Sequence, residues 1–221
     1  MPLKVTLREF LTAGDMKQIA ELAATKKRVL PSLVSLTYDH DPLVAWRAVE
    51  AVGLAASRIA EDDPDFVREH LRRLLWLISE ESGGVCWHAP EAMAEIVRLQ
   101  PQLYADYIPI VVSLIENIEA EDLEHFRAGT LRAIGRLASV ASDHIPAVLP
   151  SVAASLCDPD PQTRGMAVWC LAQIGELEPL ADVTELAGDL GPVVLYEDGL
   201  LSSTTVSAIV RRAVHGQSAE R

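Results

Sequence analysis

A turn followed by an amphipathic helix recurs along this chain about every forty residues, and this repeat restricts the possible folds more than any other feature. The clearest copy, residues 158–175, reads DPDPQTRGMAVWCLAQIG. Asp160 can accept hydrogen bonds from the free N–H groups of a first helical turn, and Pro161 suits the first helical position. Gly175 follows the apolar run, where a residue of positive φ often ends a helix. The segment is therefore predicted to form a tight turn and one helix.

Three earlier helices align with this one. Their first core positions are 41, 41 and 37 residues apart, and most aligned positions keep their size and polarity class. The aligned sets are Val44, Val85, Phe126 and Thr163; Ala48, Ala89, Thr130 and Ala167; and Val52, Met93, Ile134 and Leu171. Solenoid proteins are built from such units, each packed only on its neighbours. We therefore expect a single all-α solenoid of four helical pairs.

Charge and composition restrict the partners of such a stack. The chain carries 19 basic and 32 acidic residues, and its net charge is −13. Nucleic-acid binding needs clustered basic side chains, so neither nucleic acid nor an anionic membrane is an expected partner. No apolar run approaches the roughly 20 residues of a membrane span, and the first ten residues lack a signal core. We expect a cytoplasmic protein.

The cysteines also indicate a cytoplasmic protein. There are three, and none forms a CxxC pair: Cys86, Cys157 and Cys170. We interpret them as small, buried apolar residues in a reducing compartment, with no disulfide framework and no zinc site.

The repeats predict the following division of a single domain, residues 1–215. An N-terminal helical cap, four repeats, a C-terminal cap and a disordered tail are expected at residues 1–25, 26–179, 180–215 and 216–221. Pro90 interrupts the second of the aligned helices, so it either kinks that helix or moves its start to a later residue.

The C-terminal cap departs from the repeat. Leu180–Leu190 is predicted to be one more helix, and Val193–Tyr196 is a β-like run followed by the turn signal Asp198-Gly199. Val206–Val214 is predicted to be a final helix. The cap is therefore expected to contain a small irregular or β-hairpin segment.

The run from Thr163 to Gly175 resembles the second helix of a HEAT repeat. It is most similar to the bacterial PBS-lyase HEAT-like subtype, whose pattern is D-P-x-x-x-V-R-x-x-A-A-x-A-L-G-x-I-G. Arg127 keeps the family arginine, whereas Ala45 and Cys86 replace it in other copies. The resemblance covers residues 26–179 and implies a right-handed solenoid, but it says little about function, because HEAT arrays have many roles.

In HEAT-like stacks the second helix of each pair lines a concave surface. With Val44 and Ala48 facing the core, helical geometry turns Trp46 away from it, and the same offset applies in later repeats. Exposed Trp beside Arg and His is typical of a binding hot spot. The alternative is that Trp46 and Trp87 fill grooves between helices. Trp76, on a first helix, is expected in the core.

The function predicted from these positions is that of a non-catalytic protein-interaction scaffold or adaptor without a cofactor. Its partner protein and its oligomeric state are not specified by the sequence. The candidate partner-binding residues are Trp46, Arg47, Glu50, Trp87, His88, Glu91, Arg132 and Arg136.

An alternative is a metal-binding or lyase-type enzyme centred on His88, Glu91 and Glu95. Deoxyhypusine hydroxylases, which have HEAT-like repeats, bind iron through His-Glu dipeptides, but none of the six histidines here precedes a glutamate. The PBS-lyase subtype is named for proteins that attach bilin pigments, so the resemblance also implies this activity as a possibility. No residue in this sequence indicates a pigment site. No nucleotide-binding or nucleophile-elbow motif is present.

Overall fold

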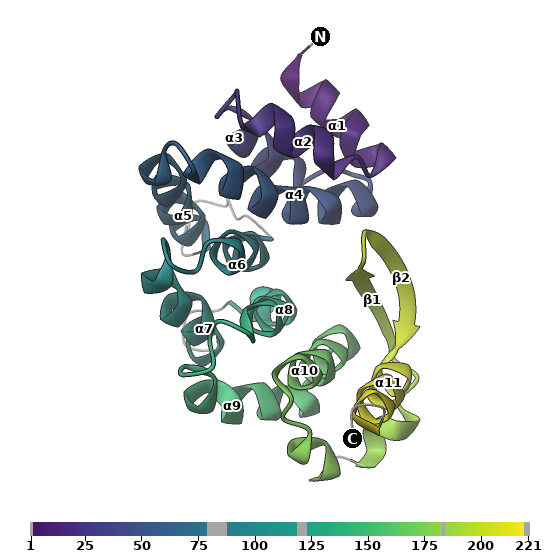
Figure 1. Ribbon diagram of the computed structural model, residues 1–221. Coiled ribbons are helices and arrows are strands. Elements are labelled where there is room, and N and C mark those ends of the chain that lie inside the picture. Colours follow the sequence, from purple (N-terminus) through teal and green to yellow (C-terminus); the bar gives the residue numbers. More distant parts are fainter. Residues whose placement is uncertain (1, 79–87, 119–122, 183, 219–221) are drawn as a thin grey trace. The chain divides into compact units, whose positions relative to one another are not determined.

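The computed structural model describes residues 2–78, 88–118, 123–182 and 184–218, which form two compact units. The first unit comprises Met1–Ile108 together with Glu197–Leu201, and the second comprises Pro109–Tyr196 together with Ser202–Arg221. Both consist mainly of helices, as the repeat predicts (Figure 1). That the chain forms a single domain remains a prediction from the sequence.

The first unit is built from helices packed around α4. The longest, α4, lies against α2, α3 and α6. The elements are α1 (Leu3–Ala13), α2 (Met16–Ala23), α3 (Val29–Leu36), α4 (Pro42–Ala60), α5 (Pro64–Ile78), α6 (Ala89–Leu99) and the 3₁₀ turn η1 (Ala105–Tyr107).

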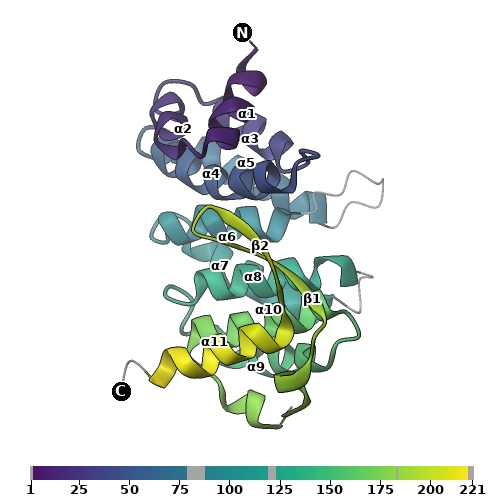
Figure 2. The same ribbon diagram turned by 90° about the vertical axis from the view of Figure 1, so that its right-hand side faces the viewer.

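The second unit continues the helical pairs and ends in a β-hairpin and a helix. Within it α10 packs against α8, α9 and α11 (Figures 1 and 2). The elements are α7 (Ile108–Asn117), η2 (Glu124–Phe126), α8 (Arg127–Leu137), α9 (Ile145–Ala154), η3 (Ser155–Cys157), α10 (Pro161–Ile174), η4 (Glu178–Asp182), η5 (Thr184–Gly188), β1 (Pro192–Glu197), β2 (Leu200–Thr205) and α11 (Val206–Ser218).

Local sequence signals fix the ends of the helices. Asp160 accepts hydrogen bonds from the backbone N–H groups of Gln162 and Thr163, and Gly175 ends α10 with φ of 82°. Asp15 caps α2 in the same way. These caps satisfy N–H groups that have no partner within the helix. The turn–helix unit predicted for residues 158–175 is confirmed.

Close approach of the paired second helices depends on glycine. A Cβ atom placed on Gly53 of α4 would lie 2.7 Å from the backbone oxygen of Glu95 on α6. In the second unit, a Cβ atom on Gly135 of α8 would lie 2.5 Å from the Trp169 ring on α10. Both distances are too short for a Cβ atom; at Gly53 the obstacle is the backbone of α6, and at Gly135 it is the Trp169 ring of α10.

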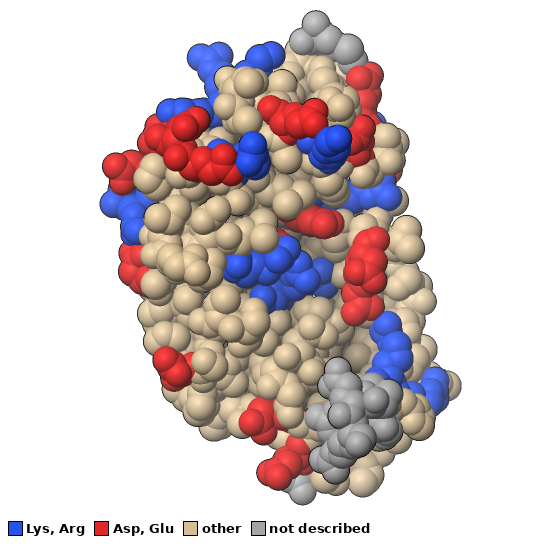
Figure 3. Space-filling view, in the orientation of Figure 1, with Lys and Arg blue, Asp and Glu red and all other residues tan. Residues whose placement is uncertain are grey.

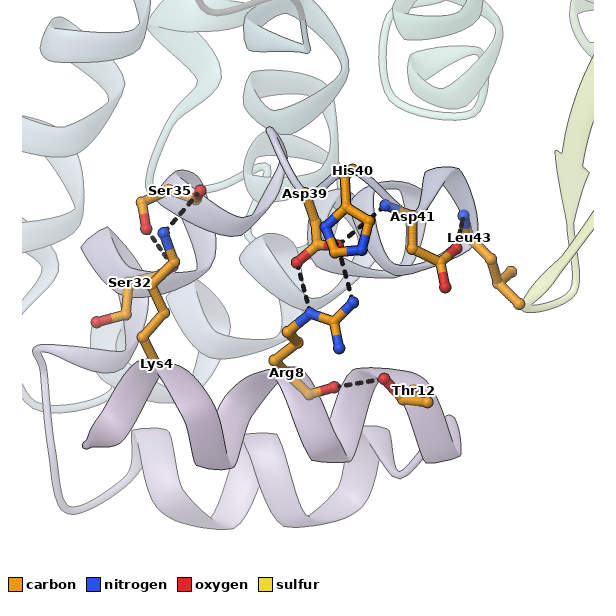
Figure 4. Close-up of polar contacts among 9 residues, drawn as sticks. All are labelled: Lys4, Arg8, Thr12, Ser32, Ser35, Asp39, His40, Asp41 and Leu43. Atoms are coloured by element: carbon orange, nitrogen blue, oxygen red, sulfur yellow. Dashed lines mark hydrogen bonds and ion pairs between the residues drawn. The ribbon is translucent and has the colours of Figure 1, made fainter. Parts of the chain in front are cut away.

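Ion pairs join consecutive helical pairs at their loops. Arg8 on α1 donates from Nε and Nη2 to the two carboxylate oxygens of Asp39, at 2.8 and 3.2 Å (Figure 4). The Asp39 carboxylate also accepts from the backbone N–H of Asp41, which caps α4 through Leu43. One carboxylate therefore fixes both α1 and the turn that starts α4.

The family arginine identified in the sequence has a comparable role. Arg127, at the start of α8, lies 3.4 Å from Asp158, which precedes α10. Both side chains are mostly buried. This pair joins one repeat to the loop of the next.

Several predicted boundaries need correction. Helix α6 begins at Ala89, because Pro90 occupies its first turn, so the later start holds and the kink does not. Leu180–Leu190 forms 3₁₀ turns and not an α-helix. Helix α11 runs to Ser218, beyond the expected start of the tail at 216.

The predicted β-hairpin is present. Strands β1 and β2 pair through a two-residue turn in which Asp198 and Gly199 both have positive φ, 50° and 75°. This is the geometry that matches the natural twist of a hairpin. Thr205 then starts α11 by accepting from the N–H of Ala208.

Candidate functional site

On the first unit, the candidate residues gather where α4 meets the start of α6. The rings of Trp46 and His88 are 4.6 Å apart between centroids and inclined by 57°. His88 precedes α6, and its Nδ1 lies 3.1 Å from Oε1 of Glu91 one turn later. The Trp46 ring therefore contacts the next helical pair, which agrees with the groove-filling interpretation.

Two carboxylates of α6 are buried beside this contact. Glu91 and Glu95 are 3% and 4% exposed. Glu95 is paired with Arg98, 2.6 Å away, whereas Oε2 of Glu91 has no hydrogen-bond partner. A buried carboxylate without partners is costly, so the contact with His88 is the main polar support of Glu91.

Arg47 joins three segments of the first unit. Its Nη1 donates to the backbone oxygens of Leu11 and Thr12, both at 2.9 Å, and its Nε donates to the oxygen of Gly199 at 3.1 Å. The first two acceptors are at the end of α1, where helical carbonyls lack partners. Arg47 therefore holds both the end of α1 and the turn of the hairpin.

Arg132 of α8 binds the hairpin in the second unit. Its Nη2 donates to the backbone oxygen of Tyr196 at 2.7 Å. Its guanidinium carbon lies 5.2 Å from the ring centroid of Trp169 and 5.7 Å from that of Tyr196. The side chain is 6% exposed. Cation–π contacts with the two rings and the bond to Tyr196 offset the burial of this charge.

A third contact with the hairpin is not indicated by any motif in the sequence. The side-chain amide of Gln162 on α10 donates to the oxygen of Val194 at 3.0 Å and accepts from its N–H at 2.8 Å. A primary amide has the same donor and acceptor as a peptide group, so Gln162 pairs with β1 as a neighbouring strand would. Nearby, Val193 packs so close to Gly165 that a Cβ there would lie 2.5 Å from it. Nothing in the pattern of α10 marks either residue.

The remaining candidates are less defined. Glu50 and Arg136 are partly buried on α4 and α8, and Trp87 lies outside the described residues. Trp76, expected in the core, is 60% exposed, which corrects that prediction.

Cys170 is buried, and burial raises the pKa of its thiol to about 12, whereas Cys157 is exposed. The prediction that the cysteines are buried is therefore wrong for Cys157.

The geometry does not favour the metal-centre alternative. His88, Glu91 and Glu95 share one side of α6, but Glu95 is occupied by Arg98. Within the described ranges, no three His, Cys, Asp or Glu side chains are grouped so that they could hold a metal ion.

The face drawn in Figure 3 carries both basic and acidic side chains. Acidic and basic side chains alternate over the N-terminal helices there. A groove that follows a phosphate backbone needs one sign of charge.

In the described part of the chain, no helix is both long and apolar enough to cross a membrane.

Comparison with known proteins identifies the repeat. Residues 124–174 match the family model of the HEAT-like repeat. The matched segment contains α8 and α10, whose side chains Arg132 and Gln162 bond to β1. An uncharacterized protein of Archaeoglobus fulgidus is 31% identical over 114 residues, which cover 52% of this chain. The chain matches 56% of that relative's length.

Proposed function

We propose that this chain is a protein-interaction scaffold that binds an extended segment of a partner protein on its predicted concave surface. HEAT-like repeats commonly act as interaction scaffolds, and residues 124–174 match that repeat. The PBS-lyase subtype and the right-handed winding remain expectations from the motif. A cytoplasmic location and a lack of nucleic-acid partners remain expectations from the acidic composition.

The observation that carries the proposal is how α8 and α10 hold β1. Arg132 and Gln162 bind backbone atoms of Tyr196 and Val194, and do not depend on which side chains the strand carries. Main-chain hydrogen bonds of this kind give affinity in strand-type peptide recognition, and side-chain pockets add selectivity. A partner segment in extended conformation could make the same bonds in place of β1.

Occupation by the chain's own hairpin would regulate this binding. A partner that uses Gln162 has to displace β1. Its apparent affinity is therefore its intrinsic affinity multiplied by the fraction of molecules in which the surface is free. Release of β1 breaks its bonds with Arg132 and Gln162 and exposes Val193, so a partner segment has to replace these contacts.

The test compares neighbouring residues of β1. Val193 is fully buried against α10, whereas Val194 is 46% exposed. Val193→Asp should release the hairpin, and Val194→Asp should leave it in place. Proteins captured by the full chain from its source cells are identified by mass spectrometry, and their affinities for both variants are measured.

We expect Val193→Asp to bind the captured partner at least about tenfold more tightly than Val194→Asp, because the surface is then free. We then add a second substitution to Val193→Asp. Gln162→Ala should lower the affinity for the partner, whereas Gln173→Ala, at an exposed position of α10, should leave it unchanged. Equal affinities of the two strand variants would refute the proposed surface. Circular dichroism confirms that the helices are intact.

A further inference from the structure

The two strands of the C-terminal hairpin have outer edges that differ. The backbone of Val194 on β1 points away from β2, because its N–H and its oxygen both bond to Gln162 of α10. Arg132 of α8 donates to the next outward oxygen of β1, that of Tyr196. The outer edge of β1 is therefore occupied by side chains that take the place of a neighbouring strand.

The outer edge of β2 has no such cover. The N–H of Val206, directly after β2, donates to the oxygen of Gly191, directly before β1, at 3.2 Å. Because backbone groups alternate in direction along an antiparallel strand, those of Leu201 and Ser203 point away from β1. The sheet consists of β1 and β2 alone. In the part of the chain that the structure describes, the outward N–H and oxygen of Ser203 have no hydrogen-bond partner.

The sequence of β2 leaves this edge unprotected. Natural edge strands are usually shielded by charged side chains, proline, a bulge or short length. Strand β2, LLSSTT, has six residues without charge or proline, although 23% of the chain is charged. One register runs from the two-residue turn to the pair of Gly191 and Val206, so residues 191–206 contain no bulge. Ser203 is exposed, and Leu200 is 65% exposed. The edge is therefore open to pairing with another strand.

The strand is complementary to a second copy of itself. If two β2 strands run antiparallel with a two-fold axis beside Ser203, the two Ser203 residues face each other and exchange both backbone hydrogen bonds. Ser202 then lies opposite Thr204 of the second copy. Hydroxyl pairs across antiparallel strands are stabilising, whereas like charges directly opposite each other are destabilising. Self-pairing of β2 creates the first kind of pair and none of the second.

We propose that two copies of this chain pair through β2 and form one antiparallel sheet of four strands, in the order β1–β2–β2–β1. The assembly stops at two copies, because Gln162 and Arg132 occupy the outer edge of each β1. A closed two-fold dimer is also the commonest form of oligomer. The contacts of β1 with α8 and α10 stay intact, so the dimer does not depend on the scaffold function.

Sedimentation of the full wild-type chain over a range of concentrations measures the oligomeric state. We expect an equilibrium between monomer and dimer, without larger species. Amide exchange followed by NMR then locates the contact. The amide hydrogen of Ser203 should become protected as the concentration rises, whereas that of Ser202, which faces β1 at every concentration, should change much less. A chain that stays monomeric, or a dimer without protection at Ser203, would overturn the proposal.

A proline variant removes the outward donor. Ser203→Pro lacks the N–H that faces the second copy, and proline is tolerated at such an edge position. Ser203→Ala is the matched control, because it keeps the N–H and loses only the hydroxyl group. The dissociation constant of the dimer should be at least about tenfold higher for Ser203→Pro than for Ser203→Ala, since each copy loses one hydrogen bond. Equal constants would contradict pairing through β2.

Charged variants test the register without a change in the backbone. Ser203→Lys and Ser203→Glu each place two like charges opposite each other, so each variant alone should dimerise more weakly than the wild type. An equal mixture should dimerise more tightly than either variant alone, because opposite charges then face each other. This gain requires that both variants are folded. A mixture no tighter than its components, with helical content intact by circular dichroism, would refute the two-fold axis beside Ser203.

Discussion

Single carboxylates decide where the helices of this chain begin. Asp160 accepts from two backbone N–H groups and from the hydroxyl of Thr163, so three donors at the start of α10 depend on it. Asp39 accepts from Arg8 and from the N–H of Asp41. Each aspartate stands beside a turn that the sequence already indicated by an Asp-Pro or Asp-x-Asp-Pro pattern.

Removing the cap of α10 should destabilise the fold measurably. Asp160→Ala leaves N–H groups of the first turn without their acceptor, and we expect a loss of about 1 kcal/mol in the free energy of unfolding. Asp160→Asn is the control, since asparagine caps helices about as well. Urea denaturation followed by circular dichroism measures both, and equal losses would mean that charge, and not capping, matters.

The Arg8–Asp39 pair predicts a dependence of stability on pH. The hydrogen bond from Arg8, the largest influence, lowers the pKa of Asp39 below its ordinary value in the folded chain. The unfolded chain then binds the proton at higher pH than the folded chain does. The contribution to stability is therefore complete above the ordinary aspartate pKa of about 3.9 and is lost as the pH falls below it.

Thermal melts of the wild type and Asp39→Asn measure this difference. The variant should melt at a lower temperature at pH 6, and the gap should close as the pH falls below about 3.9. Asp62→Asn, at an exposed position, should show no such trend. A gap that stays constant down to acid pH would exclude the ionised pair as its cause.

At the scale of elements, pairs of second helices pack at glycine. Alanine is normally favoured over glycine inside a helix by about 1 kcal/mol. At Gly53 this preference is reversed, because a Cβ atom would meet the backbone of α6 at Glu95 and not a side chain that could move. The close contact of α4 and α6 therefore depends on this residue.

Gly53→Ala should lower the free energy of unfolding by about 1–3 kcal/mol, the usual cost of overpacking. Gly188→Ala is the control, because nothing lies within 4 Å of a Cβ atom there. Chemical denaturation measures both variants. If Gly53→Ala is as stable as the wild type, α4 and α6 do not pack as closely as described.

What could be predicted from the sequence follows from how local each signal is. The caps at Asp160 and Gly175 and the hairpin turn at Asp198 are set by adjacent residues, so the sequence predicts them. The contact of Gln162 with β1 joins residues 32 positions apart and leaves no periodic trace.

The candidate site shows the same limit. Helical periodicity places Trp46 and Arg132 on a side of their helices that turns away from the helical core. It cannot tell that Trp46 meets His88 or that Tyr196 covers Arg132. Trp76 was misplaced because apolar neighbours in the sequence do not determine burial on an outer helix.

For the whole molecule, the two compact units predict regional stability. In solenoids each repeat contacts only its neighbours, so a local defect lowers stability near its own position first. Gly53 belongs to the first unit and Gly135 to the second, and a Cβ atom at either position would lie less than 3 Å from the facing helix, against backbone at Gly53 and against the Trp169 ring at Gly135.

Hydrogen exchange on Gly53→Ala and Gly135→Ala tests this. The first variant should lose protection mainly in α4 and α6, and the second mainly in α8 and α10. Mass spectrometry of peptides from the exchanged chain gives the comparison. Equal loss over all helices in both variants would show that the chain unfolds as one cooperative body.

The pairing of Gln162 with β1 also has a practical consequence. The amide hydrogen of Val194 is bonded to a side chain of α10 and not to another strand. Its exchange rate therefore reports whether the hairpin rests on the helix. Any compound or protein that displaces β1 from α10 should raise the exchange rate of this amide hydrogen. Val194 can therefore serve as a built-in probe in a screen for such ligands.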